Sequence, residues 1–149
     1  MKLENWIPWN PLKKECGEYY INDYNNSFGG LKIILCKAGT EQKTQVHVSW
    51  DGMVEAIRIM NESYRSRFWS YLDENQKNLH RSWPLFIIHD SEFLNFLSNE
   101  SCKISDRLKF KHYCIMDMEC VLDVASQLQP KVELFVNGNL IEVSEAKWH

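Results

Sequence analysis

Residues 84–99, PLFIIHDSEFLNFLSN, carry the strongest fold signal in this chain. The run 84–89 is apolar up to His89, which is typical of a strand buried on both faces. Asp90 or Ser91 can then cap a helix, which should end near Asn99. The expected apolar face of this helix consists of Phe93, Leu94, Phe96 and Leu97. The sequence therefore predicts a buried strand that leads directly into a short amphipathic helix.

Strand patterns follow this helix without an intervening linker. They lie at residues 108–115, 119–124, 131–136 and 139–143. Asn137-Gly138 separates the last two, and this pair favours a two-residue hairpin because both central residues of a type I′ turn need positive φ. We expect an α+β fold, a largely antiparallel β-sheet with one or two helices packed on one face.

The N-terminal half contributes further strand patterns, at residues 18–22, 31–36 and 45–50. Asp51-Gly52 follows the last of them and precedes an apolar run at 53–59, which predicts another hairpin. One amphipathic helix from 54 to 71 is the alternative interpretation. Residues 62–80 are largely polar with partly helical spacing, so this stretch can be either helix or strand.

Length and composition indicate one soluble domain. The chain has 149 residues, 44% of them hydrophobic and 25% charged, with no repeat. We expect a single globular domain over 1–149, with a proline-interrupted aromatic arm at 1–12 and a loose tail at 144–149. The five cysteines lack C-x-x-C spacing, and no signal-peptide pattern or membrane-length apolar run is present. These features predict a cytoplasmic protein without membrane contact.

Chemistry-bearing residues are present, but no established catalytic motif connects them. Phosphate-binding glycine loops, the G-x-S-x-G elbow and H-E-x-x-H are absent from the sequence, so we expect neither a cofactor nor a metal. His112, Cys114 and Cys120 are the best metal candidates, and either cysteine could act as a nucleophile with His112 or His89 as base. The alternative is that both cysteines are small buried hydrophobes.

Charged residues within the strand patterns need partners. Asp123 lies in an otherwise apolar strand, so we expect it to bond to His112 or Tyr113 and to join two strands. A catalytic carboxylate is the alternative for Asp123. Arg65 and Arg67 lie near an acidic residue and are interpreted as surface ion pairs, which contribute little to stability.

One basic cluster interrupts an otherwise mildly acidic chain of net charge −3, and it consists of Lys103, Arg107, Lys109 and Lys111. With Phe110 and Tyr113 interleaved, the cluster could bind single-stranded nucleic acid. The alternative is that its lysines face solvent on an ordinary strand and discourage edge-to-edge aggregation. Because the chain has no global basic field, we do not expect nucleic acid as a partner.

The order of motifs between residues 89 and 132 resembles a group of small single-domain bacterial proteins, the immunity partners of secreted polymorphic toxins. The resemblance rests on the helix Ser-Glu-Phe-Leu-x-Phe-Leu at 91–97, His112-Tyr113, Leu122-Asp123-Val124 and Pro130. Asp51-Gly52 and Tyr64-Arg65 support it more loosely. The matching part is about a third of the chain, and the arm at 1–12 has no counterpart.

This resemblance implies a stoichiometric mechanism, in which the protein binds one cognate toxin domain in the cytosol and blocks it. An acidic surface with aromatic anchors suits a basic toxin. The matching residues resemble fold determinants, so partner contacts are expected in segments that the core does not need, at Trp6, Trp9, Asp73 and Glu74. The alternative for the two tryptophans is that they only cover the sheet.

Two other functions remain open from the sequence. One is a non-catalytic regulatory or phage anti-defence module, which would differ from an immunity protein in its genomic neighbourhood. The other is a small enzyme, which would require His112, Asp123 and a cysteine to converge in one pocket. A small-molecule ligand is not expected on either binding interpretation.

Overall fold

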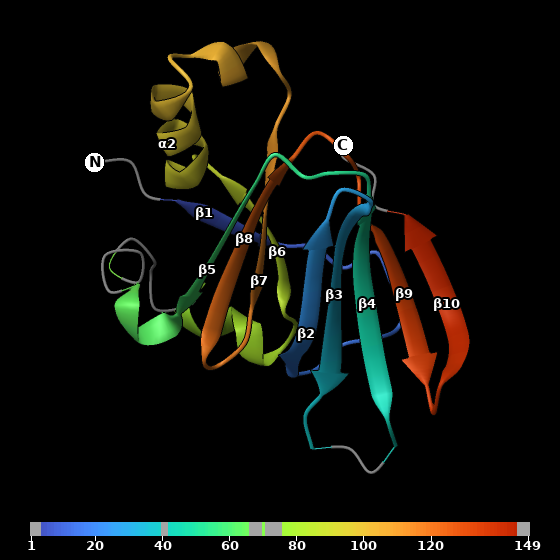
Figure 1. The fold of residues 1–149 in the computed structure, drawn as a ribbon. Coiled ribbons are helices and arrows are strands. Elements are labelled where there is room, and N and C mark those ends of the chain that lie inside the picture. Colours follow the sequence, from blue (N-terminus) through green and yellow to red (C-terminus); the bar gives the residue numbers. More distant parts are fainter. Residues whose placement is uncertain (1–3, 40–41, 66–69, 71–75, 146–149) are drawn as a thin grey trace.

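The computed structural model describes residues 4–39, 42–65, 70 and 76–145. They form two five-stranded antiparallel sheets that pack face to face (Figure 1). Sheet A has the strand order β1-β6-β7-β8-β5, and sheet B has the order β10-β9-β4-β3-β2. The expected α+β class with antiparallel pairing is confirmed, but the strands form two sheets rather than one.

The strands of sheet A are β1 (Asn5–Pro8), β5 (Ala56–Asn61), β6 (Leu85–His89), β7 (Lys111–Met116) and β8 (Cys120–Ser126). Those of sheet B are β2 (Tyr19–Ser27), β3 (Gly30–Lys37), β4 (Thr44–Asp51), β9 (Lys131–Val136) and β10 (Asn139–Glu145). The helix α2 (Glu92–Glu100) is joined by the short 3-10 helices η1 (Glu62–Tyr64), η2 (Gln76–Arg81) and η3 (Ile104–Arg107). Within the described residues, no helix is long and apolar enough to cross a membrane.

The main core lies between the two sheets. Every second residue of β4 points into it, so that Val46 and Val48 are fully buried and Trp50 is 1% exposed. The Trp50 ring meets the ring of Tyr113 from sheet A edge-on at 5.5 Å. Burying one such side chain stabilises the fold by roughly 1.5–3 kcal/mol. The period-two pattern of residues 45–50 thus reflects one face of sheet B turned to sheet A.

Sheet A is buried on both faces, as the apolar run at 84–89 predicts. Leu85 and Ile87 of β6 point into the core between the sheets, whereas Phe86 and Ile88 point outward. The outward residues pack in a second cluster with Trp6 of β1, whose ring lies 5.1 Å from that of Phe86. Helix α2 stands against the outer side of sheet A at one end (Figure 1). Trp6 and Leu79 of η2 pack on the outward residues of β6, which explains why this strand needs no polar face.

Asp51-Gly52 does not form the predicted hairpin. The neighbours of β4 are β3 and β9, whereas β5 pairs with β8 in the other sheet. Gly52 has a φ of +133°, but Asp51 does not share the positive φ that a type I′ turn requires. The pair therefore marks a crossover between the sheets, because the apolar residues of β4 and β5 approach one core from opposite sides. The alternative helix is also absent, since β5 occupies part of its range.

The other hairpin signal is confirmed. Asn137 and Gly138 have φ values of +51° and +80° and connect β9 to β10. Strand β10 continues to Glu145, so the beginning of the expected tail is strand, and residues 146–149 lie outside the described residues. At the other terminus, β1 ends at Pro8 and forms an edge of sheet A, where a missing backbone N–H is tolerated.

Candidate functional site

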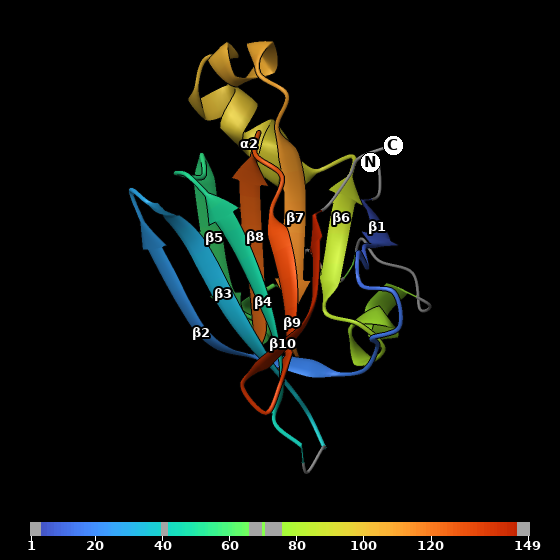
Figure 2. The same ribbon diagram turned by 90° about the vertical axis from the view of Figure 1, so that its right-hand side faces the viewer.

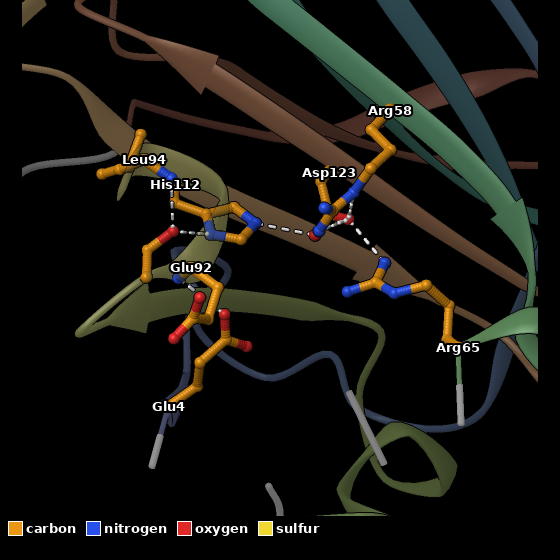
Figure 3. Close-up of polar contacts among 8 residues, drawn as sticks. Glu4, Arg58, Arg65, Glu92, Leu94, His112 and Asp123 are labelled. Carbon is orange, nitrogen blue, oxygen red and sulfur yellow. Dashed lines mark hydrogen bonds and ion pairs between the residues drawn. The ribbon is translucent and has the colours of Figure 1, made fainter. Parts of the chain in front are cut away.

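The outer side of sheet A holds a buried cluster of polar side chains (Figure 3). Antiparallel pairing places Cys114 opposite Asp123, and His112 two residues earlier on β7 points to the same side. The His112 Nε2 and Asp123 Oδ1 atoms are 2.6 Å apart, and both side chains are fully buried. The predicted bond between His112 and Asp123, which joins β7 to β8, is confirmed.

Two arginines complete the coordination of the Asp123 carboxylate. Arg58 on β5 lies opposite Asp123 and donates from Nε at 3.0 Å and Nη2 at 2.9 Å, both to Oδ2. Arg65 donates to the same oxygen from Nη1 at 2.7 Å. The side chain of Arg65 is only 7% exposed, so its interpretation as a surface ion pair was wrong. Arg67 lies outside the described residues.

These contacts determine the ionisation of Asp123. Burial alone would raise the pKa of this carboxyl group, but the hydrogen bond from His112 and the charges of Arg65 and Arg58 outweigh it and hold the pKa well below its usual range. Asp123 is therefore ionised at neutral pH and only accepts hydrogen bonds. It follows that Nε2 of His112 carries a proton and that Nδ1 faces the next group in the cluster.

That next group is the hydroxyl of Ser91, at the junction of β6 and α2. Its Oγ lies 2.6 Å from Nδ1 of His112 and accepts the N–H of Leu94 at 3.0 Å, which confirms Ser91 as the helix N-cap. Asp90 before it has a φ of +56° and turns the chain sharply from strand to helix. A cavity of about 180 Å³ reaches both Ser91 and His112. The arrangement is a continuous chain, Ser91–His112–Asp123.

Glu4 adds a second carboxylate beside the N-terminus of α2. Its Oε1 accepts the N–H of Glu92 at 2.8 Å, whereas its buried Oε2 has no hydrogen-bond partner among the described residues. Burial raises the pKa of Glu4, although the Glu92 hydrogen bond and the charge of Arg65 oppose the shift. The charged form of Glu4 therefore costs stability in the folded state.

Replacing Glu4 by glutamine should raise the melting temperature at pH 7. Glutamine keeps an oxygen for the Glu92 N–H and removes the buried charge, a gain on the order of 1 kcal/mol. Because the folded-state pKa is raised, Glu4 contributes no penalty below the unfolded pKa of about 4.3, and the gain should vanish there. Thermal unfolding of Glu4→Gln from pH 3.5 to 7 measures this. Exposed Glu92→Gln is the control and should not stabilise, because it removes a favourable charge from the first helical turn.

The cysteine candidates do not join this cluster as metal ligands. Cys114 is fully buried, and burial followed by the charge of Asp123 raises the pKa of its thiol well above the usual range. Cys120 lies at the other end of β8, opposite Asn61, and burial raises its pKa to about 11. In the described part of the chain, no three His, Cys, Asp or Glu side chains form a group that could hold a metal ion.

No family model, curated protein or solved structure matches this chain. The possible sites are therefore interpreted from their own geometry. By that criterion the structure brings His112, Asp123 and Cys114 together, with the Cys114 thiol beside the Asp123 carboxylate, and adds Ser91 as the group bonded to His112. A serine that caps a helix gives no catalytic motif in the sequence, so only the folded arrangement shows the chain of hydrogen bonds.

Of the four residues expected to contact a partner, two are buried and two lie outside the described residues. Trp6 and Trp9 are 3% and 8% exposed, and both pack in the interior, Trp9 with its ring 5.3 Å from that of Tyr113. Their burial agrees with the alternative that the tryptophans cover sheet A. Asp73 and Glu74 lie outside the described residues. Tyr113 is also buried, so it cannot stack nucleic-acid bases beside the basic cluster.

The outer face of sheet B is a second candidate site, and no motif in the sequence predicts it. Three rows of paired residues cross all five strands on this face; two contain its apolar side chains, and the third, which includes Lys32 and Lys131, is polar. The first row consists of Tyr20, Cys36, Gln45, Phe135 and Leu140, and the second of Asp23, Ile34, His47, Glu133 and Val143. Tyr20, Leu140 and Val143 are about half exposed. Figure 2 shows no described helix over these strands.

Six of these ten positions are apolar or aromatic, although they point away from the core. An antiparallel sheet with one solvated face normally alternates apolar and polar residues. Two strand sequences indicate this face, because Ile34 and Phe135 are apolar at positions where the alternation of apolar and polar residues predicts a polar one. We name these two rows the open face.

Proposed function

We propose that this protein is an immunity-type binding protein, which neutralises a cognate bacterial toxin by forming a stoichiometric complex in the cytoplasm. The open face is the single observation that carries this proposal. Contiguous apolar residues on an uncovered surface mark protein–protein contacts more often than isolated ones do. Tyr20 and Phe135 offer the aromatic anchors that binding hot spots favour.

The net charge of the whole chain, −3, is the ground for a basic partner. Asp23 and Glu133 lie within the open face, the polar row beside it contains Lys32 and Lys131, and Lys131 Nζ lies 3.8 Å from Glu133 Oε1. Complementary charge accelerates association and excludes wrong partners more than it adds affinity. Because both residues are acidic, Asp73 and Glu74 remain proposed contacts with the basic partner. A regulatory or anti-defence module would use the same surface, and the gene neighbours would distinguish it.

Coexpression with the products of the adjacent reading frames tests this function. One of them should be toxic alone, and the present protein should restore growth and copurify with it at a 1:1 ratio. Survival without a complex, or a complex without rescue, would contradict the proposal. If no neighbouring product is toxic, the immunity function is wrong.

Replacing Leu140 by glutamate should weaken the complex with that toxin domain by roughly 30-fold or more, the effect of a hot-spot residue. A charge within an apolar contact loses its solvation when the partner binds. Because Leu140 is 51% exposed, the free protein should retain its melting temperature. Titration calorimetry measures the affinity, and Phe28→Glu provides the matched control, since Phe28 is 91% exposed in the β2–β3 turn outside the open face. Equal affinities of the Leu140 variant and the unmodified protein would exclude this face.

A further inference from the structure

We propose that Ser91, His112 and Asp123 form an acyl-transfer site that hydrolyses small carboxylic esters. This activity is independent of the proposed binding function. Ser91 would be the nucleophile, His112 the general base and Asp123 a positioning residue. The observation behind it is the hydrogen-bonded chain in Figure 3, with 2.6 Å between Ser91 Oγ and His112 Nδ1 and 2.6 Å between His112 Nε2 and Asp123 Oδ1.

Both distances meet the requirement for a nucleophile, its base and the group that orients the base. The two oxygens of Asp123 have separate tasks. Oδ2 accepts the hydrogen bonds of Arg58 and Arg65, and Oδ1 is left for His112. The imidazole is thereby fixed with Nε2–H toward Asp123 and Nδ1 toward Ser91. A triad works through such fixed roles and not through sequence order.

The position of Ser91 favours its activation. It lies at the sharp turn from β6 into α2, where the helix N-terminus carries partial positive charge. The N–H of Leu94 already donates to Ser91 Oγ at 3.0 Å, which stabilises negative charge on that oxygen.

The adjoining cavity limits the substrate. Its volume is about 180 Å³, and beside Ser91 and His112 it is lined by the apolar residues Ile88, Leu94 and Phe110 and by the polar residues His89, Asp90 and Lys111. Pockets for drug-sized ligands are larger, roughly 300–1,000 Å³. The cavity therefore fits the short acyl group of a neutral ester, such as an acetyl or butyryl group.

The reaction balances with water as the only second reactant. Ser91 Oγ attacks the ester carbonyl carbon, and its proton moves to Nδ1 of His112. The bond from the carbonyl carbon to the alkoxy oxygen breaks, and the alcohol leaves with that proton. Water then gives its proton to Nδ1 and attacks the acyl-serine, and the proton returns to Ser91 as the carboxylic acid is released. Asp123 keeps its charge throughout and holds the imidazolium.

Hydrolysis of p-nitrophenyl acetate and p-nitrophenyl butyrate by the purified protein tests this site. Ser91→Asn is the decisive variant, because asparagine is as good an N-cap as serine but has no nucleophilic hydroxyl. The unmodified protein should hydrolyse the esters at least roughly 100-fold faster than this variant. Diisopropyl fluorophosphate should label Ser91, as identified by peptide mass spectrometry.

Ser98→Ala removes another hydroxyl from the same helix and should leave the rate and the labelling unchanged. Melting temperatures of all variants show whether Ser91→Asn is folded. If it unfolds, the labelling of the unmodified protein alone decides the question, since only a nucleophilic serine reacts. Absence of a label on Ser91, or equal rates for a folded Ser91→Asn variant and the unmodified protein, would overturn the proposal.

Discussion

Replacing Asp123 by asparagine should lower the free energy of unfolding by about 3–5 kcal/mol, the usual effect of removing one partner from a buried ion pair. The substitution keeps the shape of the side chain but removes its charge. The buried Arg65, with a side chain only 7% exposed, then loses the carboxylate to which its Nη1 donates, and His112 loses its acceptor carboxylate. For a chain of this size the melting temperature should fall by roughly 6–20 °C. Chemical and thermal denaturation measure both quantities.

Asp23→Asn is the control for this change, because Asp23 is an exposed aspartate on β2 and its replacement should alter stability by no more than about 0.5 kcal/mol. The pH dependence gives a second check. Since the folded-state pKa of Asp123 is depressed, its contribution is present above the unfolded pKa of about 3.9 and is lost as the pH falls below it. The difference in stability between the two proteins should therefore narrow progressively as the pH falls below about 4. A loss under 1 kcal/mol at pH 7 would contradict the structural importance of this carboxylate.

Local signals predicted the parts of the fold that local contacts determine. The β6–α2 unit has its strand pattern, cap and helix within 16 residues, and the Asn137-Gly138 turn requires only its own backbone conformation. Asp51-Gly52 has a similar hairpin pattern in the sequence but lies at a crossover between the two sheets. Pairing of β4 with β3 and β9 leaves no free edge for β5, and that competition between strands is invisible in a short window.

The candidate site was only partly predictable for the same reason. A lone carboxylate in an apolar strand indicated a partner for Asp123, and the nearby His112 was found. Arg58 and Arg65 are separated from Asp123 by 65 and 58 residues along the chain. Nothing in the sequence around an arginine shows that its charge will be buried. Ser91 was predicted as a cap, but its second contact depends on the packing of α2 against sheet A.

Replacing Gly30 by alanine should destabilise the protein by about 3 kcal/mol, from positive-φ strain and overpacking together. Gly30 has a φ of +132°, and a Cβ atom there would lie far inside contact distance of the carbonyl oxygen of Trp50. The same Cβ would approach the backbone N of Gly52 to 3.0 Å. Neither neighbour is a flexible side chain, so the backbone itself must move. Thermal denaturation should show a melting temperature lower by roughly 6–12 °C.

Gly39→Ala separates the two causes of this effect. Gly39 has a φ of +70° but no atom within 4 Å of an added Cβ, so its replacement should cost only the conformational term of about 1–2 kcal/mol. The free energy of unfolding that Gly30→Ala loses beyond the loss in Gly39→Ala measures the cost of crowding at the β4–β5 crossover. At this crossover Gly30 and Gly52 form a parallel bridge. That crossover leads the chain from sheet B into β5, the strand that carries Arg58. Equal losses in the two variants would mean that the backbone at Gly30 relaxes freely and that this contact does not fix the crossover.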